Sequence, residues 1–146
     1  MRKIGIIGMG NMGKAIFEQL KKSGKFEVSG CEHQDDHNKI IGGCEIVLIA
    51  VKPQNFQELC GQMNVDFRNK LIISIMMGVT MEKIEKGLKA EKVVRTMPNL
   101  PLKVGRGLTG WVASKEVSNE EKKVIRELFN ILGKEIELDS EGKINS

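Results

Sequence analysis

Three patterns in the 146-residue sequence predict an α/β fold built on a doubly wound, mostly parallel sheet. Short runs such as Glu45–Val51 and Lys70–Ile75 are apolar almost without interruption, as is typical of parallel strands that helices cover on both faces. Segments with apolar residues at helical spacing alternate with these runs. A glycine-rich turn, within IGIIGMGNMGKAI at positions 4–16, joins the first strand to the first helix. This alternation of strands and helices is the order that builds parallel sheets.

The strands are expected where apolar or β-branched runs end at glycine or polar residues. In chain order the expected strands span Lys3–Ile7, Phe26–Ser29, Glu45–Val51, Lys70–Ile75, Lys92–Thr96, Leu108–Ala113 and Glu135–Leu138.

The helices are predicted from apolar spacing and from their capping residues. Thr80 is expected to cap one helix, and Ser118 with Glu121 forms a capping box for another. The polar end Asp139–Ser146 has no apolar periodicity, so one domain over residues 1–146 is expected. The expected helices run from the glycine turn to Gly24, over Asn55–Met63, over Met81–Leu88 and over Asn119–Leu132.

Composition argues against several classes of function. The formal net charge is +4, but the lysines are scattered along expected helices and aromatic residues make up only 4%, so no nucleic-acid partner is expected. No apolar run is long enough for a membrane span and no signal peptide is recognised, which predicts a cytoplasmic protein without a membrane partner. The three cysteines form no CxxC pair, and their odd number argues against a disulfide framework.

The glycine turn predicts a bound dinucleotide. Gly8, Gly10 and Gly13 stand in GxGxxG spacing, with a strand before them and a helix after them. Gly8 permits a tight turn, Gly10 lets a pyrophosphate approach the backbone, and Gly13 allows close packing of helix on strand. The alternative is a purely structural glycine turn. The cofactor-binding residues expected here are Gly8, Met9, Gly10, Asn11, Met12 and Gly13.

The segment after the second strand bears on which dinucleotide is bound. An acid at this place accepts hydrogen bonds from the ribose hydroxyls of NAD, whereas a cation favours the 2′-phosphate of NADP. The sequence has Glu32 there, followed by Asp35 and Asp36 and by no arginine. Charge alone therefore favours NADH, although His33 and Ser29 offer hydrogen bonds to a phosphate.

The same segment raises the alternative of a metal site. Cys31, His33, His37 and Cys44 lie close together in the sequence, but their spacing matches no common zinc pattern. A solvated loop is the interpretation that we favour, and no metal is expected. Whether these four residues have a redox or metal role is left open.

Two further loops are expected to line the same crevice, because ligands of open parallel sheets bind beyond the carboxyl ends of the strands. The first comprises Ala50, Val51, Lys52 and Pro53, and the second is the stretch SIMMGVT at 74–80. Lys52 has an alternative interpretation as a surface lysine before a proline that begins a helix.

Four ordered motifs together resemble the pyrroline-5-carboxylate reductase family. They are IGIIGMGNMGKAI at 4–16, AVKP at 50–53, SIMMGVT at 74–80 and VVRTMPNLPLKVGRGLT at 93–109. The resemblance implies a Rossmann-like N-terminal domain that binds NADP or NAD, in the reduced form, and reduces the C=N bond of the cyclic imine carboxylate to proline. It also implies that the glycine turn, Ala50–Pro53, Met76, Met77 and Gly78 hold the cofactor, and that Met97, Pro98 and Asn99 bind substrate.

Three departures from the family qualify what the resemblance implies. Met76 and Met77 stand where family members have small residues, and Ser29–Glu45 is too short for a crossover plus a strand. The sheet is therefore expected to lack one edge strand, and the family's NADPH preference is left open. The helical dimerisation domain through which the family forms homo-oligomers is expected to be absent after residue 146.

The sequence thus predicts the cofactor-binding domain of a reductase that converts 1-pyrroline-5-carboxylate to proline, incomplete and with little activity alone. No catalytic residue is assigned. The alternatives are a non-catalytic module that binds or senses NAD(P)H, and a reductase of the same class that acts on another imine.

Overall fold

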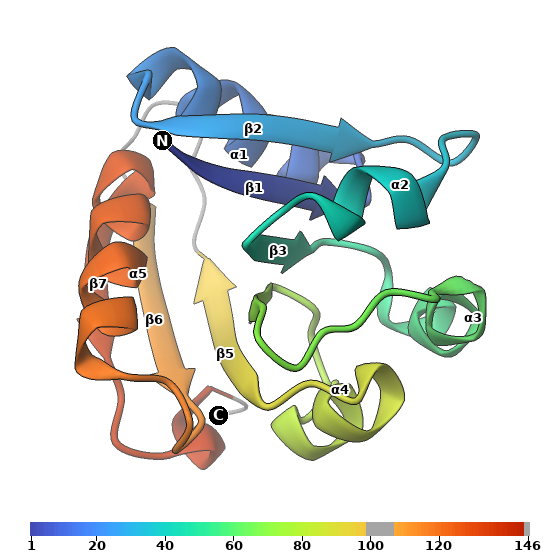
Figure 1. Ribbon diagram of the computed structural model, residues 1–146. Coiled ribbons are helices and arrows are strands. Elements are labelled where there is room, and N and C mark those ends of the chain that lie inside the picture. Colours follow the sequence, from blue (N-terminus) through green and yellow to red (C-terminus); the bar gives the residue numbers. More distant parts are fainter. Residues whose placement is uncertain (99–106, 145–146) are drawn as a thin grey trace.

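The computed structural model describes residues 1–98 and 107–144, and it confirms the predicted α/β class (Figure 1). One seven-stranded sheet has the strand order β2-β1-β3-β4-β5-β6-β7. The strands are β1 (Arg2–Ile7), β2 (Phe26–Cys31), β3 (Ile46–Ile49), β4 (Leu71–Ser74), β5 (Lys92–Pro98), β6 (Gly107–Ala113) and β7 (Gly133–Glu137).

Helices cover both faces of this sheet. Two of them, α1 and α5, contact each other on one face, while α2, α3 and α4 lie on the other. In Figure 1, α5 lies beside β6 and β7, and α2, α3 and α4 lie at the opposite side of the picture. The helices are α1 (Asn11–Ser23), α2 (His37–Gly42), α3 (Phe56–Gln62), α4 (Met81–Leu88) and α5 (Asn119–Leu132), with 3-10 turns η1 (Pro53–Asn55) and η3 (Glu141–Lys143).

The topology places a switch point between β1 and β3. The first five strands run parallel, and β5 and β6 are antiparallel. From β1 the chain passes through α1 to β2 on one side, and from β2 it returns through α2 to β3 on the other side of β1. Ligands of such sheets bind where the strand order reverses, beyond the carboxyl ends of the strands.

The predicted loss of an edge strand is confirmed within the described residues, where β2 forms the edge of the sheet. The segment that follows β2 is not the solvated loop that the sequence favoured. It contains the short helix α2, whose N-terminus is capped by the Asp36 side chain through the Lys39 amide, at 3.2 Å. Ile41, at 0% exposure, packs α2 onto the sheet, and this packing stabilises a helix that would be too short to form alone.

The core consists of two apolar layers, one on each face of the sheet. On one face, Ile16 and Leu20 of α1 and Phe129 of α5 pack against alternate residues of the central strands. On the other face, Ile84 of α4 and Leu59 of α3 pack against the remaining alternate residues. Because both faces are buried, β3 is apolar at every position and β4 at all but its last residue, Ser74, as the nearly continuous apolar runs predicted.

The carboxyl-terminal segment differs from the prediction. The polar end that begins at Asp139 has no apolar periodicity in the sequence and was expected to mark the end of the domain, but η3 forms there and Ile144 is buried at 5% exposure. The Glu141 carboxylate ion-pairs with the Arg95 guanidinium at 2.7 Å and accepts a hydrogen bond from the Met81 amide at 2.7 Å. A charge inside the core therefore holds this turn, which apolar periodicity alone does not reveal.

Within the described residues, no helix is both long and apolar enough to cross a lipid bilayer.

Candidate functional site

The glycine turn lies at the carboxyl end of β1, at the switch point of the sheet. Gly8 has φ +98°, a conformation that side chains rarely adopt. A Cβ placed on Gly8 would lie 2.7 Å from the carbonyl carbon of Ala50, so the glycine turn and the loop after β3 touch directly. A Cβ on Gly13 would overlap the Gly8 carbonyl oxygen, which means that α1 packs closely on the turn.

The middle glycine of the turn differs from its neighbours because it has open space before it. A Cβ placed on Gly10 would meet no atom within 4 Å. Gly10 is also the N-cap of α1, and no side chain of the described residues caps that helix end. The first amide groups of α1, beginning at Asn11, therefore face this space as hydrogen-bond donors at the positive end of the helix dipole.

These three observations fit the pyrophosphate of a dinucleotide. The space above Gly10 is the cradle that a Cβ would begin to fill, and the uncapped helix end supplies donors for phosphate oxygens. Met9 shapes the side of the turn, since a Cβ on Gly30 of β2 would lie 2.8 Å from its sulfur atom. Met12, in the first turn of α1, packs against the core.

The loop after β3 is anchored to the glycine turn. The Ala50 amide donates to the carbonyl oxygen of Ile7 at 2.7 Å, and Lys52 is the N-cap of η1, which begins at Pro53. The Lys52 side chain is exposed. Its exposed position is compatible with both interpretations of Lys52, as a residue that binds a cofactor phosphate and as a surface lysine before a proline.

The loop after β4 separates two methionines that the sequence treated as a pair. The Met76 amide donates to the buried Ser74 hydroxyl at 3.1 Å, and the Met76 side chain is 3% exposed within the core. The Met77 side chain is 65% exposed, and Gly78 has φ +74°. Of the two side chains, that of Met77 is therefore the one free to contact a ligand.

The expected substrate residues fall at the end of β5. Met97 is half-buried and pairs with Gly110 of β6, while Pro98 pairs with Thr109. The strand was predicted to end at Thr96, but β5 continues through Pro98. Asn99 lies outside the described residues.

A pocket of about 430 Å³ opens beyond the carboxyl ends of β1, β2 and β3. We call it the carboxyl-end pocket. Ile7 and Val51 form apolar parts of its lining, and Glu32 follows the last residue of β2. The Glu32 amide donates to an Asp35 carboxylate oxygen at 2.8 Å. The polar side chains that line it are His33, Asp35, Asp36, His37, Asn38, Asn55, Glu58 and Gln62.

The cysteines and histidines near this pocket form no metal centre in the described part of the chain, where no group of three His, Cys, Asp or Glu is suitably placed. Cys31 and Cys44 are buried, and burial, with smaller contributions from Asp35 and Cys44, raises the pKa of the Cys31 thiol to about 12. Because burial also raises the pKa of the Cys44 thiol, both thiols are protonated and unreactive at neutral pH. The His37 ring approaches the Asp35 carbonyl oxygen at 2.9 Å.

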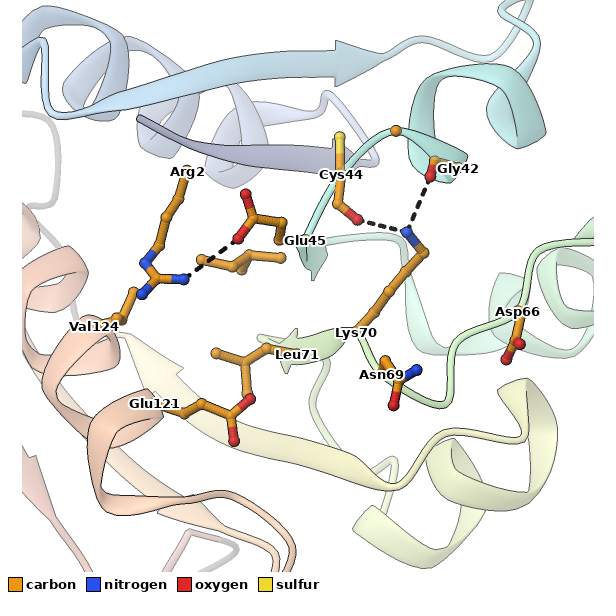
Figure 2. A pocket seen from close by; sticks show the side chains of 12 residues that line it. Arg2, Gly42, Cys44, Glu45, Asp66, Asn69, Lys70, Leu71, Glu121 and Val124 are labelled. Atoms are coloured by element: carbon orange, nitrogen blue, oxygen red, sulfur yellow. Dashed lines mark hydrogen bonds and ion pairs between the residues drawn. The ribbon is translucent and has the colours of Figure 1, made fainter.

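A second pocket, of about 440 Å³, lies at the amino ends of β1, β3 and β4 (Figure 2). We call it the amino-end pocket. Arg2 ion-pairs with Glu45 at 3.3 Å, and Figure 2 shows Lys70 reaching across to the carbonyl oxygens of Gly42 and Cys44, the first at 3.1 Å. Its charged groups are thus engaged by the chain itself, and it lies at the end of the sheet opposite to the glycine turn.

Sequence reasoning missed several residues of the site. Asn55 and Glu58 reach the carboxyl-end pocket from the helical segment after β3, and no sequence motif marks them. Outside the two pockets, the ion pair of Arg95 with Glu141 was also missed. An arginine within the apolar run of β5 was a usable signal, because a buried guanidinium requires an acidic partner.

The chain was compared with known proteins. The family described as NADP oxidoreductase, coenzyme F420-dependent, matches residues 3–41 and, in an overlapping segment, residues 29–78. Pyrroline-5-carboxylate reductase of Pasteurella multocida is 34% identical over 156 aligned positions, which cover 91% of this chain and 57% of the relative. The Aquifex aeolicus enzyme of that name is 34% identical, with coverage of 87% and 54%. The chain therefore spans little more than half the length of these relatives.

Solved structures agree with the fold. Pyrroline carboxylate reductase of Plasmodium falciparum, in a crystal structure with NADP bound, matches with a TM-score of 0.86 and 26% identity over 94% of this chain and 58% of that protein. The Streptococcus pyogenes enzyme matches with a TM-score of 0.85 at 24% identity, over 97% of this chain and 60% of that protein.

Proposed function

The chain belongs to the NADP oxidoreductase family described as coenzyme F420-dependent, as a dinucleotide-binding domain of the pyrroline-5-carboxylate reductase type, and from this premise we propose its function. We propose that it holds NADPH or NADH for the reduction of 1-pyrroline-5-carboxylate to proline. The observation that carries the proposal is the open space above Gly10, next to the uncapped end of α1.

The division of labour follows from the chemistry of the substrate. A protonated cyclic imine already accepts hydride well, so the reaction needs positioning more than an acid and a base. The reduced nicotinamide supplies the hydride when it is bound. The glycine turn and the loop after β3 hold the phosphates. Met77 and Gly78 lie in the loop after β4, the strand next to β3, and contribute to the nicotinamide side. Met97, Pro98 and Asn99 contribute to the substrate side.

The chain spans 57% of the Pasteurella relative, so the activity of whole relatives is proposed for it only together with the remaining part of their length. Alone, the 146 residues are proposed to bind the cofactor and to turn over little, because one half-site excludes water poorly. A cytoplasmic location and assembly into homo-oligomers through a further helical domain belong to the same proposal.

Titration with NADH and with NADPH tests the binding proposal, with the change in nicotinamide fluorescence as the measure of binding. Gly10→Ala should fold normally, because its Cβ meets no atom within 4 Å, yet it should weaken binding about tenfold or more by intruding on the pyrophosphate. Gly42→Ala is the matched control: its Cβ also meets no atom within 4 Å, and it lies in the amino-end pocket.

Equal binding by Gly10→Ala and the wild type would contradict the proposed phosphate site. A steady-state assay of imine reduction separates the enzyme from a non-catalytic module that binds NAD(P)H. Activity that appears only when the remaining part of a relative is supplied supports the reductase, whereas binding without activity in either case supports the module.

A further inference from the structure

We propose that the carboxyl-end pocket selects NADH over NADPH, with Asp35 and Asp36 as the residues that determine this specificity. The inference rests on the proposed function, because it concerns the adenosine end of the same cofactor site. It departs from the NADP named for the matching family and for the Plasmodium structure.

The pocket occupies the place where the two cofactors differ. It opens beyond β2, next to the strand end at which the adenosine ribose of a dinucleotide is bound in doubly wound sheets. NADPH carries a 2′-phosphate there with a charge of roughly −1.5 to −2 at neutral pH, whereas NADH carries a neutral hydroxyl. The charge and the free donors of the pocket therefore decide between them.

The charges of the lining oppose a phosphate. Carboxylates of Asp35, Asp36 and Glu58 line the pocket, and Glu32 directly follows β2 in the chain. No lysine or arginine lies among the lining residues that the structure describes. The basic groups facing the pocket are His33, which is exposed, and His37, whose Nδ1 is already engaged by the Asp35 carbonyl oxygen at 2.9 Å.

Three backbone amides around the end of β2 and the start of α2 are already engaged by the chain. The Glu32 amide at the end of β2 donates to the Asp35 carboxylate at 2.8 Å, and the Asp35 amide donates back to the Glu32 carbonyl oxygen at 3.1 Å. The Lys39 amide at the start of α2 donates to the Asp36 carboxylate. The chain thus places its own anions on these amides, where the 2′-phosphate would compete with two fixed negative charges.

The apolar part of the pocket suits the adenine ring. Ile7 and Val51 belong to the lining, at the ends of β1 and β3, and both pack against the core beneath. The two ribose hydroxyls of NADH would find the carboxylates of Asp35 and Asp36 as hydrogen-bond acceptors in the same pocket. An acid at this place is the arrangement that favours NADH in doubly wound sheets. The short crossover from β2 to β3 brings Asp35, and Asp36 as the N-cap of α2, to this position.

Binding measurements by calorimetry test the inference without using activity. At fixed low salt the wild type should bind NADH at least about tenfold more tightly than NADPH, which is about 1.4 kcal/mol. 5′-AMP should likewise exceed 2′,5′-ADP as a competitor, since these two probes differ only in the 2′-phosphate. Raising the salt concentration should narrow both ratios through screening.

The double variant Asp35→Asn, Asp36→Asn isolates the charge. Asparagine keeps a side-chain oxygen for both amides and caps helices as well as aspartate does, so the turn and α2 should persist. We expect tighter NADPH binding and a fall of about tenfold in the NADH to NADPH affinity ratio. Asp66→Asn, which removes one charge from the amino-end pocket, should leave the ratio unchanged.

Equal or tighter binding of NADPH by the wild type overturns the specificity inference and leaves the proposed function standing. An unchanged ratio in the double variant overturns the roles of Asp35 and Asp36. Failure of both nucleotides to bind overturns the proposed function and the specificity inference together.

Discussion

The amino-end and carboxyl-end pockets are nearly equal in volume, at about 440 and 430 Å³, but the two ends of the sheet differ in how their polar groups are satisfied. In the amino-end pocket, Arg2 pairs with Glu45, and Lys70 bonds two backbone carbonyl groups. At the carboxyl end of the sheet, outside the lining of the carboxyl-end pocket, the end of α1 at Gly10 has amide donors that no side chain of the described residues caps. Volume does not distinguish the two ends, whereas available donors do.

The comparison teaches that a polar cluster satisfied within the chain is part of the structure. Arg95 and Glu141 illustrate this near the carboxyl ends of the strands, where their ion pair joins β5 to η3. A site that binds a ligand instead keeps hydrogen-bonding capacity that the chain does not use, and the chain accepts a cost for it.

The largest expected effect is that of Gly13→Ala, which attacks the packing beneath the binding end of the sheet. Its Cβ would overlap the Gly8 carbonyl oxygen, a backbone atom that cannot move aside. We expect the free energy of unfolding to fall by about 3 kcal/mol, with loss of nucleotide binding. Urea unfolding beside Gly10→Ala checks this, and similar midpoints for the two variants would contradict the close approach.

A smaller effect is expected of Glu141→Ala, which leaves the Arg95 guanidinium, at 1% exposure, without its carboxylate. Loss of one partner of a largely buried pair should lower the free energy of unfolding by about 2 kcal/mol. The matched control is Asp139→Ala, which breaks the exposed pair with Lys143 and should lower the free energy of unfolding much less, because solvent screens an exposed pair. Equal midpoints in thermal or urea unfolding would show that the buried pair contributes no more than a surface pair.

At neutral pH the smallest effect concerns Cys31, whose pKa burial raises to about 12. In the unfolded chain a thiol titrates near 8.5, so between these values the unfolded state loses a proton that the folded state keeps. The thiol's contribution to stability is therefore complete below about pH 8.5 and is lost as the pH rises toward 12, by at most about 1.4 kcal/mol per pH unit.

Urea unfolding at a series of pH values from about 8 to 10 measures this slope. Cys31→Ala should show a shallower decline than the wild type, whatever its absolute stability. Parallel declines in the two proteins would mean that Cys31 titrates normally in the folded state.

Much of the fold followed from local patterns. The apolar runs that became β3 and β4 and the capping box of Ser118 and Glu121 at the start of α5 each appear in the structure where they were predicted. These features depend on neighbours in sequence, so the sequence contains the whole signal. The segment after β2 was harder, because α2 has only six residues and is held by packing of Ile41 on the sheet.

The sequence by itself determined the α/β class, the missing edge strand and the glycine turn, since each depends on the spacing of a few residues along the chain. Only the tertiary structure decided that Met76 is in the core while Met77 is exposed, and that Asp35 covers the Glu32 amide. It alone brought Glu141 to Arg95, 46 positions away. The physical reason is that burial and hydrogen bonding depend on which distant segments meet, and no local pattern specifies that meeting.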